Sequence, residues 1–340
     1  MPVEPRVAVV GSGSWGSALA GVVAGKGVKT ILWARRPELA EAIATRHENP
    51  DYLPGSPLPH SLMATDDLAE AVERSTAVVM AVPSHGYRDV FRRVAPLLAP
   101  DAPVLSLTKG IEQERMRRMS EVMAEEADLE PSRIAVLSGP NLAREVAMGQ
   151  PSATVLACAD EGRARELQGL FMAPTFRVYT NPDVVGVELG GAMKNVIAIA
   201  AGIAAGLGFG DNAKASLITR GLAELARLGA AMGGNPLTFA GLAGMGDLVA
   251  TCYSPLSRNR MVGEQLGKGR TLEAIVSEMK MVAEGVKTSR PLCALAHAHG
   301  LEVPISEQVV RVLYEGVAPT DLVRSLMLRE AKPELHGLEG

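Results

Sequence analysis

A lysine at the start of a long uncharged segment is the residue of this sequence with the clearest chemical potential. Lys194 lies in the segment 184–208, VVGVELGGAMKNVIAIAAGIAAGLG, and residues 195–210 carry no charge. Such a segment predicts a helix that is buried on all sides. An ammonium group in a buried helix is costly unless it has partners or a function. Gly190 and Gly191 lie one turn earlier on the same face, and we expect them to let a flat ligand approach the lysine.

Three other polar groups could act together with Lys194. Asp247 and Thr251 are one helical turn apart and face the same way. The segment 257–260, SRNR, combines a hydroxyl, an amide and two guanidinium groups, which are suitable donors for a phosphate. Lys109 follows a predicted strand and could hold a phosphate or a carbonyl group. A solvated lysine and a polar helix start at the surface are the alternative interpretations. We predict that Lys194 faces a substrate beside a cofactor.

A glycine-rich turn near the N-terminus predicts where that cofactor binds. The apolar run 6–10 (RVAVV) is followed by the turn 11–16 (GSGSWG) and then by a segment with helical spacing. Gly11 would make the tight turn, Gly13 would let backbone amides approach a pyrophosphate, and Gly16 would allow the helix to pack on the strand. The pattern therefore predicts a dinucleotide site. An ordinary strand-to-helix turn is the alternative.

Two arginines follow the second predicted strand, at residues 28–34. NAD-selective folds place an acidic residue there to hold the ribose hydroxyls, whereas this chain has Arg35 and Arg36. Guanidinium groups suit the additional 2′-phosphate of NADP. We predict that NADPH is accepted, with preference. The alternative is a solvated arginine pair on an open loop.

Strands and helices alternate up to residue 182. Further strands are predicted at 77–82, 103–107, 134–137, 153–158 and 175–179, and helices at 66–75, 87–98, 115–126, 141–148 and 161–171. Residues 47–59 read as an irregular loop. The alternation predicts a Rossmann-type α/β domain with a doubly wound, mostly parallel sheet. Ligands bind beyond the carboxyl ends of such strands, where Lys109 and Gly139 are expected, together with His85, either as a base or as an ordinary loop histidine.

After a turn at residues 181–183 the alternation stops. The helices predicted beyond it are 184–208, 213–232, 272–279, 283–300 and 307–314. The sequence therefore predicts two domains, a dinucleotide-binding domain at residues 1–182 and an all-α substrate-binding domain at residues 183–335.

Composition narrows the functional class. The chain has 340 residues, a formal net charge of −4 and a pI of about 5.9, which argues against nucleic acid as a main partner. Cys158, Cys252 and Cys293 have no spacing typical of a disulfide framework or zinc site, and suit a reducing cytosol. We expect no metal, because no ligand cluster is visible in the sequence, and no signal peptide, because the N-terminus lacks a long apolar stretch. We also expect no membrane span, because residues 195–210 are few and rich in glycine.

With these residues in place, the chain resembles the bacterial NAD(P)-dependent glycerol-3-phosphate dehydrogenase family. The resemblance runs from the glycine turn to about Met327. It is carried by the motifs GSGSWGSALA, SLTKGIE, SGPNLAREVA, VELGGAMKNVIAIAAGI, ITRGLAE, GLAGMGDLVATC and SRNR. The combination of GGAMKN, GDLVATC and SRNR is specific, whereas the glycine turn alone would be a weak signal.

The resemblance implies reversible reduction of dihydroxyacetone phosphate to sn-glycerol 3-phosphate with NADP or NAD, which feeds phospholipid synthesis. It implies a cytoplasmic homodimer with Lys194 as general acid and base. The implied substrate contacts are Lys109, Gly139, Asn141, Lys194, Asp247, Ser257, Arg258 and Asn259. Together with Gly11, Gly13 and Gly16, the implied cofactor contacts are Ser14, Trp15, Arg35, Arg36, Lys109, Ala143, Arg258, Val282 and Glu284.

One residue departs from the family pattern. The family usually has serine or threonine where this chain has Asn141, although an asparagine can also donate and accept hydrogen bonds. Two other functions stay open at this point. One is a β-hydroxyacid or 6-phosphogluconate type of dehydrogenase, which would lack GDLVATC and SRNR. The other is a non-catalytic NAD(P)H sensor, which would not need a proton donor.

Overall fold

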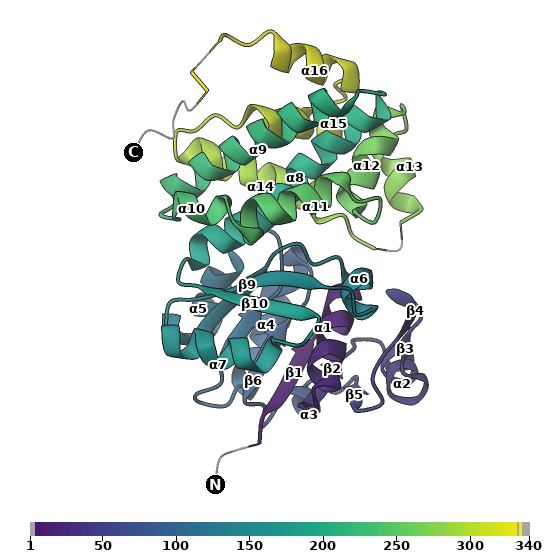
Figure 1. Ribbon diagram of the computed structural model, residues 1–340, viewed down its shortest axis with the longest axis vertical. Coiled ribbons are helices and arrows are strands. Elements are labelled where there is room, and N and C mark those ends of the chain that lie inside the picture. The colour runs from purple at the N-terminus through teal and green to yellow at the C-terminus, as the bar shows by residue number, and fades with distance from the viewer. Residues whose placement is uncertain (1–3, 280, 332, 335–340) are drawn as a thin grey trace. The chain divides into compact units, whose positions relative to one another are not determined.

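The computed structural model describes residues 4–279, 281–331 and 333–334. The chain forms two compact units (Figure 1). The first comprises Met1–Thr108 and Met119–Val184, and the second comprises Lys109–Arg118 and Val185–Gly340. The segment of ten residues that begins at Lys109 therefore clusters with the helical unit, although it lies within the range predicted for the first domain. The predicted end of the second domain, residue 335, lies outside the described residues.

The first unit is built on a sheet of eight strands in the order β10-β9-β8-β7-β6-β1-β2-β5. The strands are β1 (Arg6–Val10), β2 (Lys29–Trp33), β5 (Leu62–Thr65), β6 (Ala77–Met80), β7 (Val104–Ser106), β8 (Ile134–Ser138), β9 (Ser152–Cys158) and β10 (Phe176–Asn181). Every neighbouring pair is parallel except β8 and β9, which are antiparallel. This confirms the predicted doubly wound, mostly parallel sheet.

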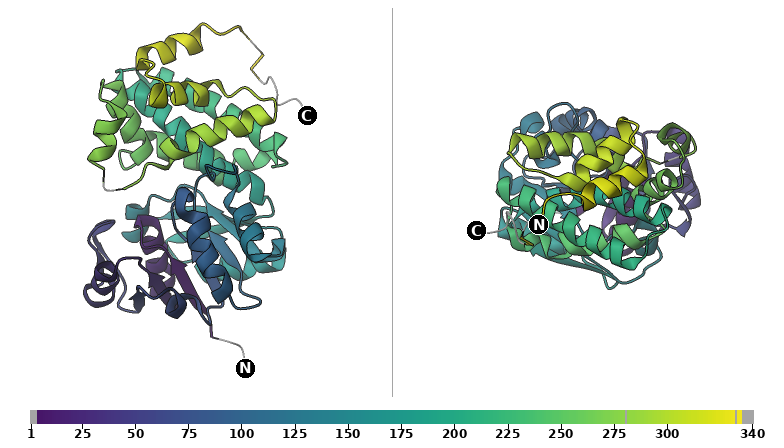
Figure 2. Two further views of the ribbon diagram at one scale, coloured as in Figure 1. Left: turned by 180° about the vertical axis from the view of Figure 1, so that it is seen from behind. Right: turned by 90° about the horizontal axis from the view of Figure 1, so that it is seen from above.

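Helices cover both faces of this sheet. The side chains of Val7 and Val9 pack on one face, and those of Ala8 and Val10 pack on the other, as the two-residue period of a strand requires. The first face is covered by α1 (Ser14–Gly25) and α7 (Glu161–Phe171), and the second by α3 (Leu68–Val72), α4 (Tyr87–Val94) and α5 (Met119–Ala127). Figure 2 shows α4 and α5, in blue, from behind. Burial on both faces explains why the central strands β1 and β6 are continuous apolar runs.

Three details of the first unit differ from the prediction. Residues 47–59, predicted as an irregular loop, contain an antiparallel hairpin of β3 (Glu48–Asn49) and β4 (Leu53–Pro57). The helix α2 (Pro37–Arg46) and the strand β5 were not predicted. The helix predicted from residue 115 begins only at Met119, because Met116 has φ of 55° and the chain turns there.

Every element in the described part of the second unit is helical, as predicted. The helices are α8 (Val184–Gly206), α9 (Asp211–Ala231), α10 (Pro236–Phe239), α11 (Asp247–Tyr253), α12 (Arg258–Gly267), α13 (Leu272–Ser277), α14 (Glu284–Ala298), α15 (Pro304–Tyr314) and α16 (Pro319–Met327). A π-helical turn, η4 (Leu242–Gly246), leads directly into α11. Such turns are rare and often lie next to functional residues.

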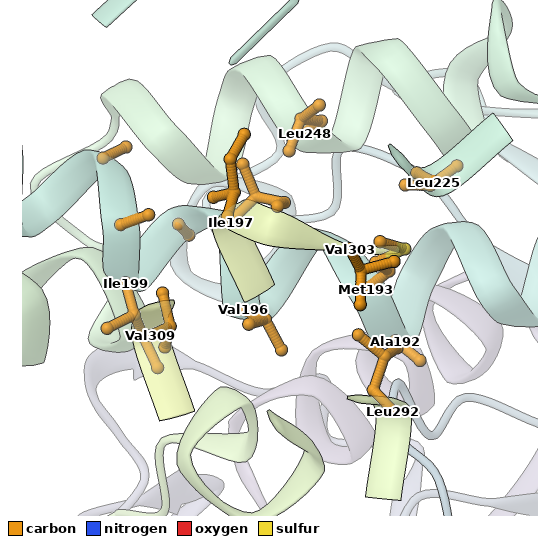
Figure 3. Packing of buried hydrophobic residues seen from close by; sticks show 14 of the residues in the cluster. Ala192, Met193, Val196, Ile197, Ile199, Leu225, Leu248, Leu292, Val303 and Val309 are labelled. Atoms are coloured by element: carbon orange, nitrogen blue, oxygen red, sulfur yellow. The ribbon is translucent and has the colours of Figure 1, made fainter. Parts of the chain in front are cut away.

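Helix α8 is the centre of the second unit. Its side chains pack against residues of several other helices, among them Leu225, Leu248, Leu292 and Val309 (Figure 3). By length and composition alone, the helix could cross a membrane. However, 89% of its most apolar 18-residue stretch is buried inside the protein. Packing within the unit therefore accounts for its apolar composition.

Glycines let α12 approach α8 at backbone contact. A Cβ atom on Gly202 of α8 would lie 2.1 Å from the carbonyl oxygen of Arg260, and one on Gly263 of α12 would lie 2.0 Å from that of Ile199. Only glycine fits at such distances, as at other close helix crossings. The crossing holds the N-terminal end of α12, which begins at Arg258, in a defined position on α8.

Candidate active site

The glycine turn between β1 and α1 has the geometry of an anion site. Gly11 has φ of 118°, and a Cβ atom there would lie 2.5 Å from the carbonyl oxygen of Ala81. A Cβ atom on Gly16 would lie 2.0 Å from the carbonyl oxygen of Gly11. The space beside Gly13 is open, and α1 has no acidic residue in its first turn. The uncapped amides of a helix N-terminus attract anions, so these residues fit a dinucleotide pyrophosphate.

Ser14 and Trp15 open helix α1. The hydroxyl of Ser14 donates to the carbonyl oxygen of Tyr52 at 2.6 Å. The ring of Trp15 lies 6.0 Å from that of Phe176, and its Nε1 is buried with no hydrogen-bond partner among the described residues. The side chain of Ser14 therefore ties the turn to Tyr52, and the backbone amides of both residues belong to the first turn of the helix.

The two arginines after β2 have different surroundings. Arg35 is exposed. The guanidinium of Arg36 pairs with the carboxylate of Asp51 in the hairpin, and lies 5.8 Å from the ring centre of Tyr52. The hydrogen bond from Arg36 to Asp51 raises the pKa of Arg36.

Gly139 and Asn141 follow the carboxyl end of β8. Gly139 has φ of 153°, and a Cβ atom there would lie 3.0 Å from Cα of Thr154. The side-chain amide of Asn141 donates to Oγ1 of Thr154 at 2.9 Å, whereas its Oδ1 is buried without a hydrogen-bond partner among the described residues. An amide oxygen in this state has the capacity to accept a hydrogen bond from a ligand. Ala143 is the first residue of α6 (Ala143–Ala147).

The second unit brings two lysines onto one carboxylate. Nζ of Lys194 lies 2.6 Å from Oδ1 of Asp247, and Nζ of Lys109 lies 2.6 Å from Oδ2. Lys194 also donates to Oγ1 of Thr251 at 2.7 Å. Lys194, Asp247 and Thr251 are each no more than 6% exposed. The predicted pairing of Asp247 and Thr251 on one helix face therefore serves to hold Lys194.

The segment that carries Lys109 is anchored in the second unit by several contacts, among them those of Ile111 and Arg118. Ile111 is 1% exposed and belongs to the helical core. Nη1 of Arg118 pairs with Oε2 of Glu188 on α8 at 2.7 Å. These contacts explain how a lysine that follows a strand of the first unit reaches a carboxylate on α11.

Burial and charge tune the ionisation of this cluster. Burial lowers the pKa of Lys194 to about 8, with a further contribution from the charge of Lys109, while the carboxylate of Asp247 acts in the opposite direction. Burial alone would raise the pKa of Asp247, but the two ammonium groups outweigh it and lower that pKa. Lys194 thus titrates near neutral pH beside a carboxylate that stays ionised.

Two asparagines connect three helices beside this cluster. Asn195 donates to the carbonyl oxygen of Lys109 at 3.1 Å, and Asn259 donates to Oδ1 of Asn195 at 2.8 Å. Oδ1 of Asn259 accepts from the backbone amide of Gly285 at 2.9 Å. The side chain of Asn259 is therefore largely engaged within the protein, where it positions α12 and α14 on α8.

For Gly190, the expectation of an open path for a flat ligand is wrong. A Cβ atom there would lie 2.5 Å from the carbonyl oxygen of Ala243. The space beside Gly190 is filled by the backbone of η4. Its role is to let η4 approach α8, which brings Asp247 within reach of Lys194.

The other predicted contacts lie at the starts of α12 and α14. Oγ of Ser257 accepts from the backbone amide of Arg260 at 3.2 Å and so caps α12. Burial lowers the pKa of Arg258, although the charge of Glu284 acts against this effect. Glu284 is the first residue of α14, and Val282 is 36% exposed shortly before it.

Sequence reasoning did not assign several residues that the structure brings to these sites. Asn195 is next to Lys194, and its amide type in an otherwise apolar helix was the available signal. Thr251 was paired with Asp247 but given no ligand role. Asn49, Asp51 and Tyr52 were hidden in the segment interpreted as an irregular loop.

Comparison with known proteins matches most of the chain to one family. The family model for the N-terminal domain of NAD-dependent glycerol-3-phosphate dehydrogenase matches residues 6–164, and that for the C-terminal domain matches residues 183–324. A Thermobifida fusca protein named glycerol-3-phosphate dehydrogenase (NAD(P)+) is 57% identical over 334 residues, which cover 98% of this chain and 99% of that protein.

Solved structures of glycerol-3-phosphate dehydrogenases also match this chain. The crystal structure of glycerol-3-phosphate dehydrogenase from Coxiella burnetii matches with a TM-score of 0.92 at 40% identity, covering 96% of this chain and 100% of that one. The structure of the enzyme from Saccharomyces cerevisiae matches with a TM-score of 0.81 at 29% identity, covering 95% and 99%.

Proposed function

Because the chain belongs to the NAD-dependent glycerol-3-phosphate dehydrogenase family, we propose that it interconverts dihydroxyacetone phosphate and sn-glycerol 3-phosphate with NADPH or NADH. The observation that carries this proposal is the ammonium group of Lys194, which Asp247 and Thr251 hold beside a second ammonium from Lys109. A buried proton donor with a lowered pKa suits the reduction of a ketone.

Lys194 acts as the general acid. A reduced nicotinamide, its pyrophosphate held at the glycine turn, would supply the hydride for the ketone carbon, and negative charge would then develop on the ketone oxygen. The ammonium of Lys194 stabilises this oxygen and gives it a proton, which completes the alcohol. Solvent then returns a proton to the neutral amine. In the oxidation of sn-glycerol 3-phosphate the neutral amine is the base that removes the hydroxyl proton.

Asp247, Thr251 and Lys109 prepare Lys194 for this role. The hydrogen bonds to Asp247 and Thr251 orient its amine. The pKa of Lys194, about 8, lies near neutral pH, where proton transfer in both directions is efficient. Lys109 adds positive charge for the ketone oxygen and partly offsets the carboxylate of Asp247.

Arg258 is the main phosphate ligand in this proposal, with help from Ser257 and Asn259. The guanidinium of Arg258 is partly buried, and such a group binds a phosphate more strongly than a fully exposed one, since fewer water contacts compete. Its position at the start of α12 is set by the glycine crossing with α8. Binding the phosphate there fixes the ketone relative to Lys194, so that binding energy far from the reacting carbon is used for orientation. Gly139 and Asn141 complete the proposed substrate contacts.

The proposed cofactor site begins at the glycine turn. The pyrophosphate binds at the first turn of α1, and the adenosine end binds near Arg35 and Arg36. The complete set of proposed cofactor residues is Gly11, Gly13, Ser14, Trp15, Gly16, Arg35, Arg36, Lys109, Ala143, Arg258, Val282 and Glu284.

The cellular role follows from the reaction. Glycerol 3-phosphate is the backbone of glycerophospholipids, so the enzyme would supply phospholipid synthesis. We also propose that it acts in the cytoplasm as a homodimer, as the family resemblance implies. Sedimentation at micromolar concentration tests the dimer, and a single species of monomer mass would contradict it.

Initial rates test the proposed reaction. Purified protein is given dihydroxyacetone phosphate or unphosphorylated dihydroxyacetone, each with NADPH or NADH. Rapid oxidation of the cofactor only with the phosphorylated ketone is the expected result. If protein that binds NADPH turned over neither ketone, the proposed reaction would be wrong, and a panel of β-hydroxyacids would be tested next.

A further inference from the structure

The hairpin β3–β4 is fastened to the glycine turn. The side chain of Asn49, which is fully buried, donates to the carbonyl oxygen of Ser12 and to Oγ of Ser17, both at 2.8 Å. In return, Ser14 donates to the carbonyl oxygen of Tyr52 at 2.6 Å. These three bonds give the hairpin turn a defined position relative to the predicted pyrophosphate site.

Asp51 lies in that turn, and its carboxylate lies near the end of β2. It forms an ion pair with Nη2 of Arg36, which follows the strand. Both side chains are 41% exposed, so a ligand can reach the pair. Glu38 is a second carboxylate near Arg36, but its Oε1 is 3.6 Å from Nε and its side chain is 68% exposed. Among the described residues, Asp51 is therefore the carboxylate that engages Arg36 most closely.

The pairing of Asp51 with Arg36 places a carboxylate where the chain has no acidic residue directly after β2. In NAD-selective folds the residue at the end of the second strand is an acid that accepts hydrogen bonds from the ribose hydroxyls. Here that place is taken by Arg35 and Arg36, and the neighbouring hairpin contributes Asp51 instead. A 2′-phosphate would have to compete with Asp51 for Arg36 and would meet its negative charge, whereas a ribose 2′-hydroxyl could donate to it.

We propose that Asp51 is a specificity-determining residue of the cofactor site, which reduces the NADPH preference predicted from the arginine pair by accepting the ribose 2′-hydroxyl of NADH and by withholding Arg36 from the 2′-phosphate of NADPH. This inference rests on the proposed function, because it assumes that the glycine turn binds NAD(P). It assigns the two arginines different roles. Arg35 is available to a 2′-phosphate, whereas Arg36 is available only when its pair with Asp51 opens.

Direct binding of NADPH and NADH to the full-length protein, measured by calorimetry without substrate, tests the proposal. Asp51→Asn keeps the shape of the side chain and removes its charge. We expect the ratio of the dissociation constants for NADPH and NADH to fall by about tenfold, through tighter NADPH and weaker NADH binding. Glu38→Gln, which removes the more distant and more exposed carboxylate beside Arg36, is the matched control and should change that ratio by less than about twofold.

A second pair of variants tests the cause. Arg36→Ala should weaken NADPH binding more in the Asp51→Asn background than in the unmodified protein, because only there is the guanidinium released. Asp51→Ser is the reserve variant if Asp51→Asn lowers the melting temperature, since it also removes the charge and leaves the bonds of Asn49 intact. If the ratio of the dissociation constants stayed constant in Asp51→Asn and Asp51→Ser, while both cofactors still bound, the role of Asp51 would be overturned. Absence of binding of either cofactor to the unmodified protein would instead overturn the proposed function and, with it, this inference.

Discussion

The ammonium of Lys194 lies 2.6 Å from Oδ1 of Asp247, and both side chains are almost completely buried. Since the other carboxylate oxygen pairs with Lys109, two positive charges share one negative charge in a medium of low polarity. This surplus of positive charge is suited to an oxygen that becomes negative during ketone reduction. It also makes the ionisation of Lys194 the property most directly open to measurement.

Replacement of Lys194 tests its role as the acid. Lys194→Ala should lower kcat for dihydroxyacetone phosphate reduction by about 10³-fold or more, because proton transfer and charge stabilisation are lost together. NADPH should still bind, since the glycine turn is untouched. Stopped-flow rates and NADPH titration measure the two effects separately. Turnover close to normal would remove Lys194 from the mechanism.

The pH dependence should reflect the pKa of Lys194, about 8. In ketone reduction the ammonium is required, so kcat/KM should fall as pH rises above about 8. In alcohol oxidation the neutral amine is required, so kcat/KM should rise through the same range. Lys109→Met removes a charge that lowers the pKa of Lys194. It should therefore move both the fall of kcat/KM in reduction and its rise in oxidation to higher pH. An unchanged pH dependence of kcat/KM in Lys109→Met would show that Lys109 does not act on Lys194.

The same pKa affects stability. Because burial lowers the pKa of Lys194 from 10.5 to about 8, the unfolded chain binds more protons than the folded one between these values. The contribution of this group to the free energy of unfolding should therefore rise with pH from about 8 to 10.5. Urea unfolding of Lys194→Met and of the unmodified protein, compared at pH 7.5 and 9.5, measures this contribution. A difference between the two proteins that does not change with pH would contradict it.

Loss of the buried carboxylate should destabilise the second unit. Asp247→Asn leaves two ammonium groups without their partner, which we expect to lower the free energy of unfolding by about 3 kcal/mol at neutral pH. Asp211→Asn is the control, because that exposed residue pairs with Lys214 at 3.2 Å on the surface of α9, and its loss should cost less than about 0.5 kcal/mol. Chemical unfolding measures both. Equal stabilities of the two variants would contradict the argument from burial.

The crossing of α8 and α12 should not tolerate a methyl group. Gly263→Ala would place Cβ 2.0 Å from the carbonyl oxygen of Ile199, and we expect a loss of about 3 kcal/mol, together with a higher KM for dihydroxyacetone phosphate. Gly169→Ala in α7 is the control, since a Cβ atom there would meet nothing within 4 Å and alanine favours a helix. Thermal unfolding and steady-state kinetics compare the two. Unchanged stability of Gly263→Ala would mean that the helices can separate easily.

Arg258 should act on substrate binding more than on chemistry. Arg258→Ala is expected to raise KM for dihydroxyacetone phosphate at least about tenfold, because a charged phosphate contact is lost. Arg270→Ala, which removes an arginine paired with Glu278 in the same unit, should leave KM unchanged. If Arg258→Ala left KM unchanged, the phosphate would bind elsewhere.

Much of the fold could be predicted because its signals are local. The strand at residues 6–10, the glycine turn and the following helix are contiguous, and Gly11 and Gly16 are each required by close backbone contacts at that turn. The length and apolar composition of α8 likewise indicate a buried helix. The hairpin at residues 47–59 was not recognised, because β3 and β4 are short and depend on the bonds of Asn49 to Ser12 and Ser17.

By itself, the sequence determined which residues have the right chemistry: a lysine in an apolar helix, an aspartate one turn from a threonine, and two arginines where an acid is common. Only the tertiary structure decided their partners. Lys109 and Asp247 are 138 positions apart in the chain, and Lys194 and Asp247 are 53 apart. No local periodicity relates such residues. Lys194 and Asp247 meet because Gly190 lets η4 approach α8, just as Asp51 meets Arg36 because the hairpin is fastened to the glycine turn.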